Sequence, residues 1–201
     1  MSPRTAHGRS RGRDRAANRV RIIGGKWRSR SLSWHPGASL RPTPGAVRET
    51  LFNWLGPQVS VARCLDLFAG SGALGFEAAS RGASRVVMVE SDRAAFAGLI
   101  GNRTRLAATT VECLHTEAQR FLASPARERF DIVFLDPPFS HNRVAPACEL
   151  LDAGNWLTPR ALIYVEAEIH LDPLPIPSSW HIIRSRGRGA VGYHLLQRVA
   201  P

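Results

Sequence analysis

The feature that most constrains the fold is a regular alternation of apolar and amphipathic segments that starts near residue 61. Runs rich in β-branched and aromatic residues predict buried strands at 62–68, 85–90, 109–115, 130–136 and 161–168. Segments with helical spacing lie between them, at 71–82, 91–106, 117–124 and 143–157. Strands that alternate with helices predict an α/β fold with a doubly wound, mostly parallel sheet.

Both ends of the chain depart from this alternation. The run 180–198 consists of two strand-like segments around a Gly-rich turn, which predicts an antiparallel C-terminal hairpin at the edge of the sheet. Near the N-terminus, strand-forming residues at 20–23 are followed by Gly24 and Gly25, a pair that signals a hairpin turn. The sequence therefore predicts a second, N-terminal β-hairpin that precedes the α/β part.

Segment 41–56 joins the N-terminal hairpin to the alternating part and has the spacing of a helix. Thr43 is its expected N-cap, and Pro44 would take the first helical position. The chain thus divides into a basic tail, a hairpin arm and an α/β domain, at 1–18, 19–40 and 41–201. The tail has almost no large apolar residues, so we expect it to be disordered.

Positive charge is concentrated at the N-terminus. The first 30 residues hold ten of the 27 Lys and Arg residues and one acid, a net charge of +9 out of the +11 of the whole chain. A basic arm on a nearly neutral body is typical of nucleic-acid binders, although a solvated tail that aids solubility would have the same composition. Basic residues interleaved with an aromatic residue suit RNA, through phosphate contacts and base stacking. On the arm these residues are Arg21, Lys26, Trp27, Arg28 and Arg30.

The cysteine and histidine patterns indicate neither a metal site nor disulfides. The three cysteines are far apart and form no CxxC pair, and the seven histidines are scattered. We therefore expect free thiols in a reducing cytoplasm. No apolar run is long enough to span a membrane, and no apolar stretch follows the basic N-terminus as it would in a secretory signal.

Candidate ligand-binding residues fall at the ends of successive predicted strands, where open α/β sheets bind ligands. Gly70, Gly72 and Gly75 match GxGxxG between a strand and a helix, a pattern shared with dinucleotide-binding enzymes. Glu90 ends the next strand, at a distance from the glycines where an acid accepts hydrogen bonds from ribose hydroxyls. These residues alone would suit NAD as well as other nucleoside cofactors.

Asp66 argues against NAD. It precedes Gly70 by four residues, at the edge that the ligand must cross. A carboxylate there would repel a pyrophosphate, by about 4 kcal/mol per charge pair at a separation of about 4 Å and an intermediate dielectric constant. A ligand with a sulfonium and an ammonium group suits an acid-lined loop better, and S-adenosylmethionine is such a ligand.

The fourth predicted strand ends in Asp136-Pro137-Pro138-Phe139, whose prolines have no N–H and therefore end the strand rigidly. This motif suits methylation of an exocyclic amino group, whose lone pair is delocalised into the base ring. The Asp136 carboxylate and the Pro137 carbonyl can accept the N–H bonds of the amine and stabilise the positive charge that grows on nitrogen. Phe139 can stack on the base, and the prolines hold the acceptors in place.

With these motifs the chain resembles the RsmD family, bacterial 16S ribosomal RNA guanine-N2 methyltransferases. The resemblance runs from about residue 20 to 198 and rests on RIIGGKWR, RPT…VRETLFNWL, LDLFAGSGALGFEAASRGA, VFLDPPF, ALIYVEAE and GYHLLQR. It implies a Rossmann-like class I S-adenosylmethionine-dependent methyltransferase fold and one product, N2-methylguanine in 16S ribosomal RNA. We expect a cytoplasmic monomer that acts on the small ribosomal subunit or on an assembly intermediate.

The resemblance also implies roles for individual residues. The methionine and ribose side of the cofactor pocket would be formed by Asp66, Phe68, Ala69, Gly70, Ser71 and Gly72. Glu90 would hold the ribose hydroxyls, and Glu117 and Ala118 would lie near the adenine amino group. Arg41 and Thr43 belong to the segment expected near the cofactor and the RNA target.

Two departures from the family pattern concern the RNA side of the site. Gly45 and Ala46 stand where the family usually has Asp-Arg, so one polar anchor is missing. Residues 140–143, Ser-His-Asn-Arg, stand where the family tends to carry basic residues and a Gly. The residues expected on the cofactor side are intact.

Other functions are compatible with part of the pattern. An N6-adenine methyltransferase acting on DNA or RNA uses a similar Asp-Pro-Pro-aromatic motif, but the two N-terminal blocks disfavour it. The basic arm disfavours a protein glutamine methyltransferase. A non-catalytic RNA-binding assembly factor could retain the fold, although the intact acids at 66, 90 and 136 argue against that reading.

Overall fold

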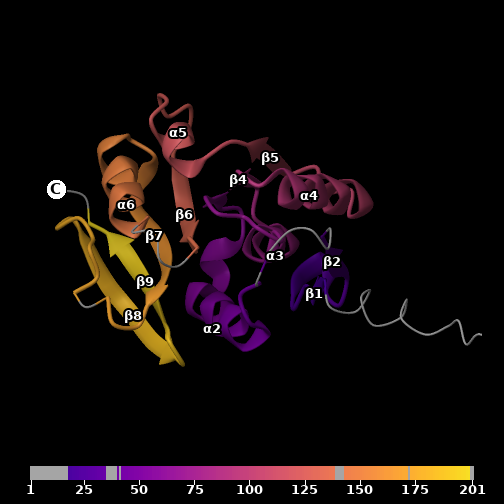
Figure 1. Cartoon of the computed structure of the whole chain (residues 1–201), viewed down its shortest axis with the longest axis horizontal. Coiled ribbons are helices and arrows are strands. Elements are labelled where there is room, and N and C mark those ends of the chain that lie inside the picture. Colours follow the sequence, from indigo (N-terminus) through magenta and orange to yellow (C-terminus); the bar gives the residue numbers. More distant parts are fainter. Residues whose placement is uncertain (1–17, 35–39, 41, 139–142, 172, 200–201) are drawn as a thin grey trace, which may run out of the picture.

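The structure, a computed structural model, describes residues 18–34, 40, 42–138, 143–171 and 173–199. Almost all of the predicted disordered tail lies outside these residues. The main sheet contains β3 (Arg63–Asp66), β4 (Arg85–Glu90), β5 (Val111–His115), β6 (Phe130–Leu135), β7 (Leu157–Glu168), β8 (Trp180–Arg188) and β9 (Val191–Arg198). Its order is β5-β4-β3-β6-β7-β9-β8 (Figure 1). Strands from β5 to β7 pair in parallel, whereas β9 pairs antiparallel with β7 and β8, as predicted.

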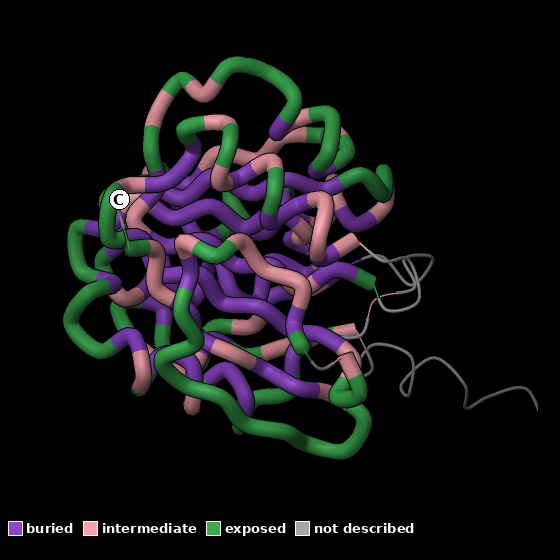
Figure 2. The backbone as a smooth tube through the Cα atoms, turned by 90° about the vertical axis from the view of Figure 1, so that its left-hand side faces the viewer, coloured by how far each residue is buried: buried purple, intermediate pink, exposed green. Residues whose placement is uncertain are grey.

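Helices cover both faces of this sheet. One core cluster contains residues of α2 (Gly45–Leu55), α3 (Ala73–Ser80) and α4 (Arg93–Arg105), and the other contains residues of α5 (Ala118–Leu122) and α6 (Val144–Ala153). In β6, Phe134 belongs to the first cluster and Val133 to the second, so the strand is buried on both faces. Such burial explains the continuous apolar runs in the sequence. Buried backbone accordingly runs through the middle of the molecule, with exposed backbone around it (Figure 2).

The parallel strands place their carboxyl ends at one edge of the sheet. Asp66 is the last residue of β3, Glu90 is the last residue of β4, and Asp136 directly follows β6. Because β3 pairs with both β4 and β6, these three acids come from neighbouring strands. Among the described residues, no helix has the length and apolar character needed to cross a membrane.

The boundary between α6 and β7 differs from the prediction, in which the helix reaches residue 157 and the strand begins at 161. The helix ends at Ala153, and Asn155 then has a left-handed φ of 58°, which interrupts the helix. Pairing with β6 already begins at Leu157, and the register of the two strands shifts further along. Pro159, which cannot donate a ladder hydrogen bond, lies in this irregular stretch.

The N-terminal arm is a hairpin of β1 (Arg19–Arg21) and β2 (Ser31–Ser33), as predicted. The glycine pair does not form a two-residue turn, however, but leads into a short 3-10 helix, η1 (Gly25–Trp27). Gly25 has a φ of 74°, and a Cβ at this position would lie 1.9 Å from the carbonyl oxygen of Ser80 in α3. Glycine is therefore required here because the arm approaches α3 so closely.

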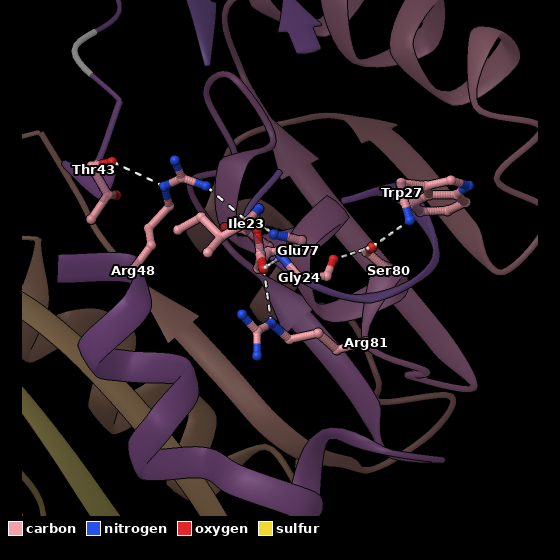
Figure 3. A network of polar contacts seen from close by, with 10 residues as sticks. Ile23, Gly24, Trp27, Thr43, Arg48, Glu77, Ser80 and Arg81 are labelled. Atoms are coloured by element: carbon pink, nitrogen blue, oxygen red, sulfur yellow. Dashed lines mark hydrogen bonds and ion pairs between the residues drawn. The ribbon is translucent and has the colours of Figure 1, made fainter. Parts of the chain in front are cut away.

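A fully buried carboxylate on α3, that of Glu77, fastens the arm to the domain (Figure 3). Its two oxygens accept hydrogen bonds from the backbone N–H groups of Ile23 at 2.7 Å and Gly24 at 2.8 Å. Arg81, directly after α3, donates to it at 2.8 Å, and the buried guanidinium of Arg48 on α2 lies 3.5 Å away. One negative charge thus joins the arm, α2 and α3.

We expect Glu77→Gln to lower the free energy of unfolding by about 3–5 kcal/mol, because it leaves the buried Arg48 without its counter-ion. Urea unfolding followed by circular dichroism measures this change. Glu49→Gln, at an exposed position of α2, is the matched control and should alter stability by less than about 0.5 kcal/mol. A loss for Glu77→Gln as small as that of the control would contradict this account of the network.

Candidate active site

The loop between β3 and α3 folds around two glycines with positive φ, Gly70 at 50° and Gly72 at 76°. A Cβ on Gly72 would lie 2.6 Å from the Phe76 ring and 2.8 Å from Leu99, so both its conformation and its surroundings require glycine. The loop connects a buried strand to the first turn of a helix, which is the context that the GxGxxG pattern predicts.

Two buried acids fix this loop at the carboxyl edge of the sheet. Asp66 Oδ2 accepts a hydrogen bond from the N–H of Gly75 at 3.0 Å. Glu90 accepts the N–H of Gly70 with one oxygen and the N–H of Asp92 with the other, each at 2.7 Å. Both carboxylates border the same cavity, as the sequence predicts.

The pKa of Asp66 is raised to about 7, mainly because the side chain is buried. The charges of Asp136 and Glu90 raise it further, and the hydrogen bond from the Gly75 N–H opposes the shift. Asp66 is therefore partly protonated near neutral pH. A cation bound beside it would favour the ionised form, so this environment suits a positively charged ligand better than an anion.

Asp136 follows β6 and ends the strand together with Pro137 and Pro138, as predicted. The Thr43 hydroxyl donates a hydrogen bond to Asp136 Oδ2 at 3.0 Å. Burial raises the pKa of Asp136 to about 6, and the hydrogen bond from Thr43 acts in the opposite direction. Phe139, which the sequence predicts to stack on the base, lies outside the described residues.

Thr43 has a different place from the one predicted. The N-cap of α2 is Pro44, without a side-chain cap bond, so the helix begins one residue later than expected. The Thr43 side chain is buried and bonds to Asp136 instead, which makes it part of the cavity wall and not of an exposed RNA surface. Arg41, predicted to act beside it, lies outside the described residues.

One acid of the cavity, Glu166 on β7, escapes prediction from the motifs. It is buried, and the Tyr164 hydroxyl donates to its Oε1 at 2.8 Å. The Thr43 hydroxyl also acts as a hydrogen-bond donor that lowers the pKa of Glu166. A signal for it exists in the sequence, because an acid interrupts the apolar run of a buried strand close to its carboxyl end, where the other site acids lie.

The single hydrogen of the Thr43 hydroxyl determines how the two acids are bonded. Asp136 has the lower pKa of the two, so the ionised Asp136 accepts that hydrogen. The same hydroxyl acts to lower the pKa of Glu166, so the two acids compete for one hydrogen. Burial, followed by the charge of Asp136, nevertheless raises the pKa of Glu166 to about 8, so Glu166 is mostly neutral at pH 7.

These groups line a cavity of about 520 Å³, within the range of roughly 300–1,000 Å³ usual for ligand pockets. The predicted cofactor residues that line it are Asp66, Phe68, Ala69, Gly70, Ser71, Glu90 and Ala118. Gly72 packs behind the loop, against Phe76. Glu117, predicted near the adenine, is exposed as the N-cap of α5 and is not part of the lining, whereas its unpredicted neighbour Thr116 is.

The predicted RNA-binding side chains of the arm differ in exposure. Those exposed to solvent are Arg21, Lys26, Arg28 and Arg30. Trp27 is only 9% exposed, packs in the core, and donates its backbone N–H to Ser80 Oγ at 2.9 Å. The Lys26 ammonium lies 4.4 Å from the centroid of its ring. The backbone of Trp27 therefore joins the arm to α3, and the burial of its indole leaves no free face for a base.

The cavity fits S-adenosylmethionine in its charge and in its size. Asp66 stands beside the glycine loop, where it would oppose the pyrophosphate of a dinucleotide but suit a sulfonium and an ammonium group. Glu90 lines the same cavity. In the part of the chain that the structure describes, no group of three or more His, Cys, Asp and Glu side chains could hold a metal ion.

Comparisons with known proteins give relatives and structural neighbours that are methyltransferases. Ribosomal RNA small subunit methyltransferase D of Escherichia coli (strain K12) is 44% identical over 184 residues, which cover 92% of this chain and 92% of that protein. A solved structure of a putative methyltransferase, yhhF, from Escherichia coli has a TM-score of 0.84 and 43% identity, and covers 91% of this chain and 99% of that chain.

A second solved structure shares the fold at lower identity. It is a 16S rRNA N2 G1207 methyltransferase of Thermus thermophilus in complex with AdoMet and guanosine, with a TM-score of 0.67 and 25% identity. The match covers 91% of this chain and 50% of that chain. The family model described as "Conserved hypothetical protein 95" matches residues 20–197. The chain therefore belongs to this family and, within it, to the RsmD proteins that its sequence motifs resemble.

Proposed function

We propose that the protein transfers a methyl group from S-adenosylmethionine to the exocyclic N2 of a guanine in 16S ribosomal RNA. The observation that carries the proposal is the position of Asp136 and Pro137 at the end of β6, on the wall of the cavity that holds the glycine loop. The name of the E. coli relative supports the RNA class. The Thermus neighbour, described with AdoMet and guanosine, supports the cofactor and the base.

On the cofactor side, two acids and the glycine loop form the binding surface. When bound, S-adenosylmethionine supplies a methyl group on a positively charged sulfur. Asp66 responds to a cation in the cavity by ionising, because its pKa of about 7 is set mainly by burial. Glu90 offers its carboxylate to ribose hydroxyls while its present hydrogen bonds to Gly70 and Asp92 keep it in place.

On the base side, Asp136 and the Pro137 carbonyl accept the N–H bonds of the guanine amino group. These bonds orient the nitrogen lone pair, and the carboxylate stabilises the positive charge that develops as the N–C bond forms. The nitrogen must then lose one proton. Asp136, with a pKa of about 6, is mostly ionised at neutral pH and is placed to accept it. The target base must leave its stack to reach this buried edge.

Glu166 is a positioning residue in this scheme, because its charge acts on Asp136 beside it. As a neutral acid, with a pKa raised to about 8, it leaves Asp136 as the ionised acceptor of the Thr43 hydrogen. An ionised Glu166 would instead place a second negative charge near Asp136 and raise the pKa of Asp136. Tyr164 holds Glu166 from the other side.

A methyl-transfer assay tests the proposal. Purified protein, labelled S-adenosylmethionine and small ribosomal subunits from cells that lack the native enzyme are incubated, and the RNA is digested to nucleosides. We expect label in N2-methylguanosine. Label in N6-methyladenosine would assign the enzyme to adenine, and absence of label from both the subunits and their assembly intermediates would reject the proposed reaction.

We expect Asp136→Ala to lower kcat by about 10²–10³-fold, the loss typical when one preorganised group that stabilises developing charge is removed. The Kd for S-adenosylmethionine, measured by calorimetry, should change little, because Asp136 acts on the base. Asp131→Ala is the control, since Asp131 lies at the opposite end of β6 in a half-exposed pair with Arg63. A kcat near that of the wild type would remove Asp136 from the mechanism.

We expect Glu166→Gln to remove part of the pH dependence of stability. The pKa of Glu166 is raised from 4.5 to about 8 in the folded protein, so binding of its proton stabilises the fold. This contribution is fully present below pH 4.5 and is lost as the pH rises through about 8. Thermal unfolding from about pH 5 to about pH 9 should therefore show a larger decrease for the wild type than for the variant. Glu168→Gln, two residues further along β7 and half exposed, is the control.

The same variant separates charge from hydrogen bonding. Gln stays neutral and can still accept from Tyr164, so kcat of Glu166→Gln at neutral pH should stay within a few-fold of the wild type, while Glu166→Ala loses that bond and most of the activity. If wild type and Glu166→Gln lost stability equally with rising pH, Glu166 would not carry the proton assigned to it.

A further inference from the structure

The last strand in the sheet order, β8, presents a row of three arginines that the site described above does not use. Arg184, Arg186 and Arg188 alternate along β8, so they share one face of the strand. From His181 to Arg188 every residue of β8 is exposed. Because β8 pairs with β9 on one side only, its other edge is open in the part of the chain that the structure describes. We call these three residues the arginine row.

The strand register shows which face carries the row. Arg184, Arg186 and Arg188 lie directly opposite Leu195, Tyr193 and Val191 of β9. Directly opposite residues of an antiparallel pair project to the same side of a sheet. Tyr193 stacks on Trp54 of α2, with ring centroids 5.6 Å apart. The row is therefore on the α2 face of the sheet, which is also the face against which the N-terminal arm packs.

The arginine row begins at the cavity. Arg188, Val191 and Tyr193 are part of the cavity lining, next to the wall that contains Asp136 and Glu166. From Arg188 the row leads away along β8, with about 6.6 Å between alternate residues of a strand. The cavity lining also includes Leu40, the last residue of the arm segment 19–40. Figure 1 shows α2 between the β8–β9 hairpin and the β1–β2 arm.

The guanidinium groups of the row are not engaged in ion pairs with the described residues. Arg184 donates to the carbonyl of its neighbour Ile183 at 2.8 Å. The acid closest in register, Glu168 opposite Val191, pairs with His170 at 3.0 Å. By contrast, Arg85 and Arg198 elsewhere on the sheet are bonded to carboxylates. The row therefore offers uncompensated positive charge at the entrance to an acid-lined site.

We propose that the arginine row is a second RNA-binding surface, which holds the phosphate backbone on the side of the target nucleotide opposite to the N-terminal arm. This inference rests on the proposed function, because it assumes that the target base enters the cavity. Guanidinium groups bind phosphate through paired hydrogen bonds, and a regular row of them suits the repeating backbone of a strand. A nucleotide held at both flanks would be fixed in register over Asp136 without any contact to the neighbouring bases.

Charged side chains also protect edge strands from pairing with other chains. If the row served this purpose alone, its removal would change self-association. It would weaken RNA binding no more than the removal of three other arginines does. The two roles are therefore separable by measuring RNA binding and oligomeric state on the same variants. Three other exposed arginines lie near the amino ends of β6 and β7, away from the carboxyl ends that border the cavity. They are Arg127, Arg129 and Arg160.

The experiment compares R184A/R186A/R188A with the control R127A/R129A/R160A, which removes the same charge. Binding to a fluorescein-labelled transcript of 16S ribosomal RNA is measured by anisotropy between about 50 and 200 mM salt. For the row variant we expect a Kd at least about tenfold weaker at low salt, and a log–log salt slope shallower by about 2, as for three lost contacts to a single strand. R184K/R186K/R188K, which keeps the charge, should retain the slope.

Equal slopes for the row variant and the control would overturn the proposal, as would failure of the wild type to bind the transcript. A shift of the row variant to dimers in size-exclusion chromatography, with an unchanged slope, would assign the row to edge protection and overturn the proposal too. Because binding is measured without catalysis, its outcome is independent of the methyl-transfer assay. A changed slope in a protein that methylates no RNA would support the row and reject the proposed reaction.

Discussion

The organisation of the molecule depends on one buried negative charge, the carboxylate of Glu77. It satisfies two backbone N–H groups of the arm and faces Arg48 on α2, so the arm and α2, although distant in sequence from α3, are assembled around it. A buried carboxylate without such partners would be strongly unfavourable. Loss of one partner therefore destabilises the whole network. Because α3 begins at the glycine loop, the arm is built onto the same helix that forms the cofactor edge.

The acids at the carboxyl edge differ from Glu77 in how their charge is balanced. Among the described residues, Asp66, Asp136 and Glu166 form no ion pair with a basic side chain as Glu77 does with Arg48, and burial raises the pKa of each. The fold therefore keeps a cluster of carboxyl groups whose protonation responds to what enters the cavity. Such a cluster can bind a cationic ligand and can accept a proton from an amine.

The sequence predicts those parts of the fold that depend on residues close together in the chain. The strand–helix alternation, the glycine loop, and the acids at 66, 90 and 136 follow from periodicity and from strand ends, and the structure places them as expected. What escapes prediction depends on contacts between distant segments. Thr43 reads as a helix cap but bonds Asp136, and Trp27 reads as a base-stacking residue but is buried against α3. Glu166 carries a signal only once a strand has been placed beside Asp136.

The shortness of α3 has a consequence for how this chain can vary. The helix has eight residues, with the glycine loop at its first turn and Glu77 and Ser80 at its last, both bonded to the arm. One inserted or deleted residue would turn those two side chains by about 100° around the helix axis, away from the arm, while the loop stayed in place. The α3 segment is thus a spacer of fixed length, and a change in its length would separate the arm from the glycine loop.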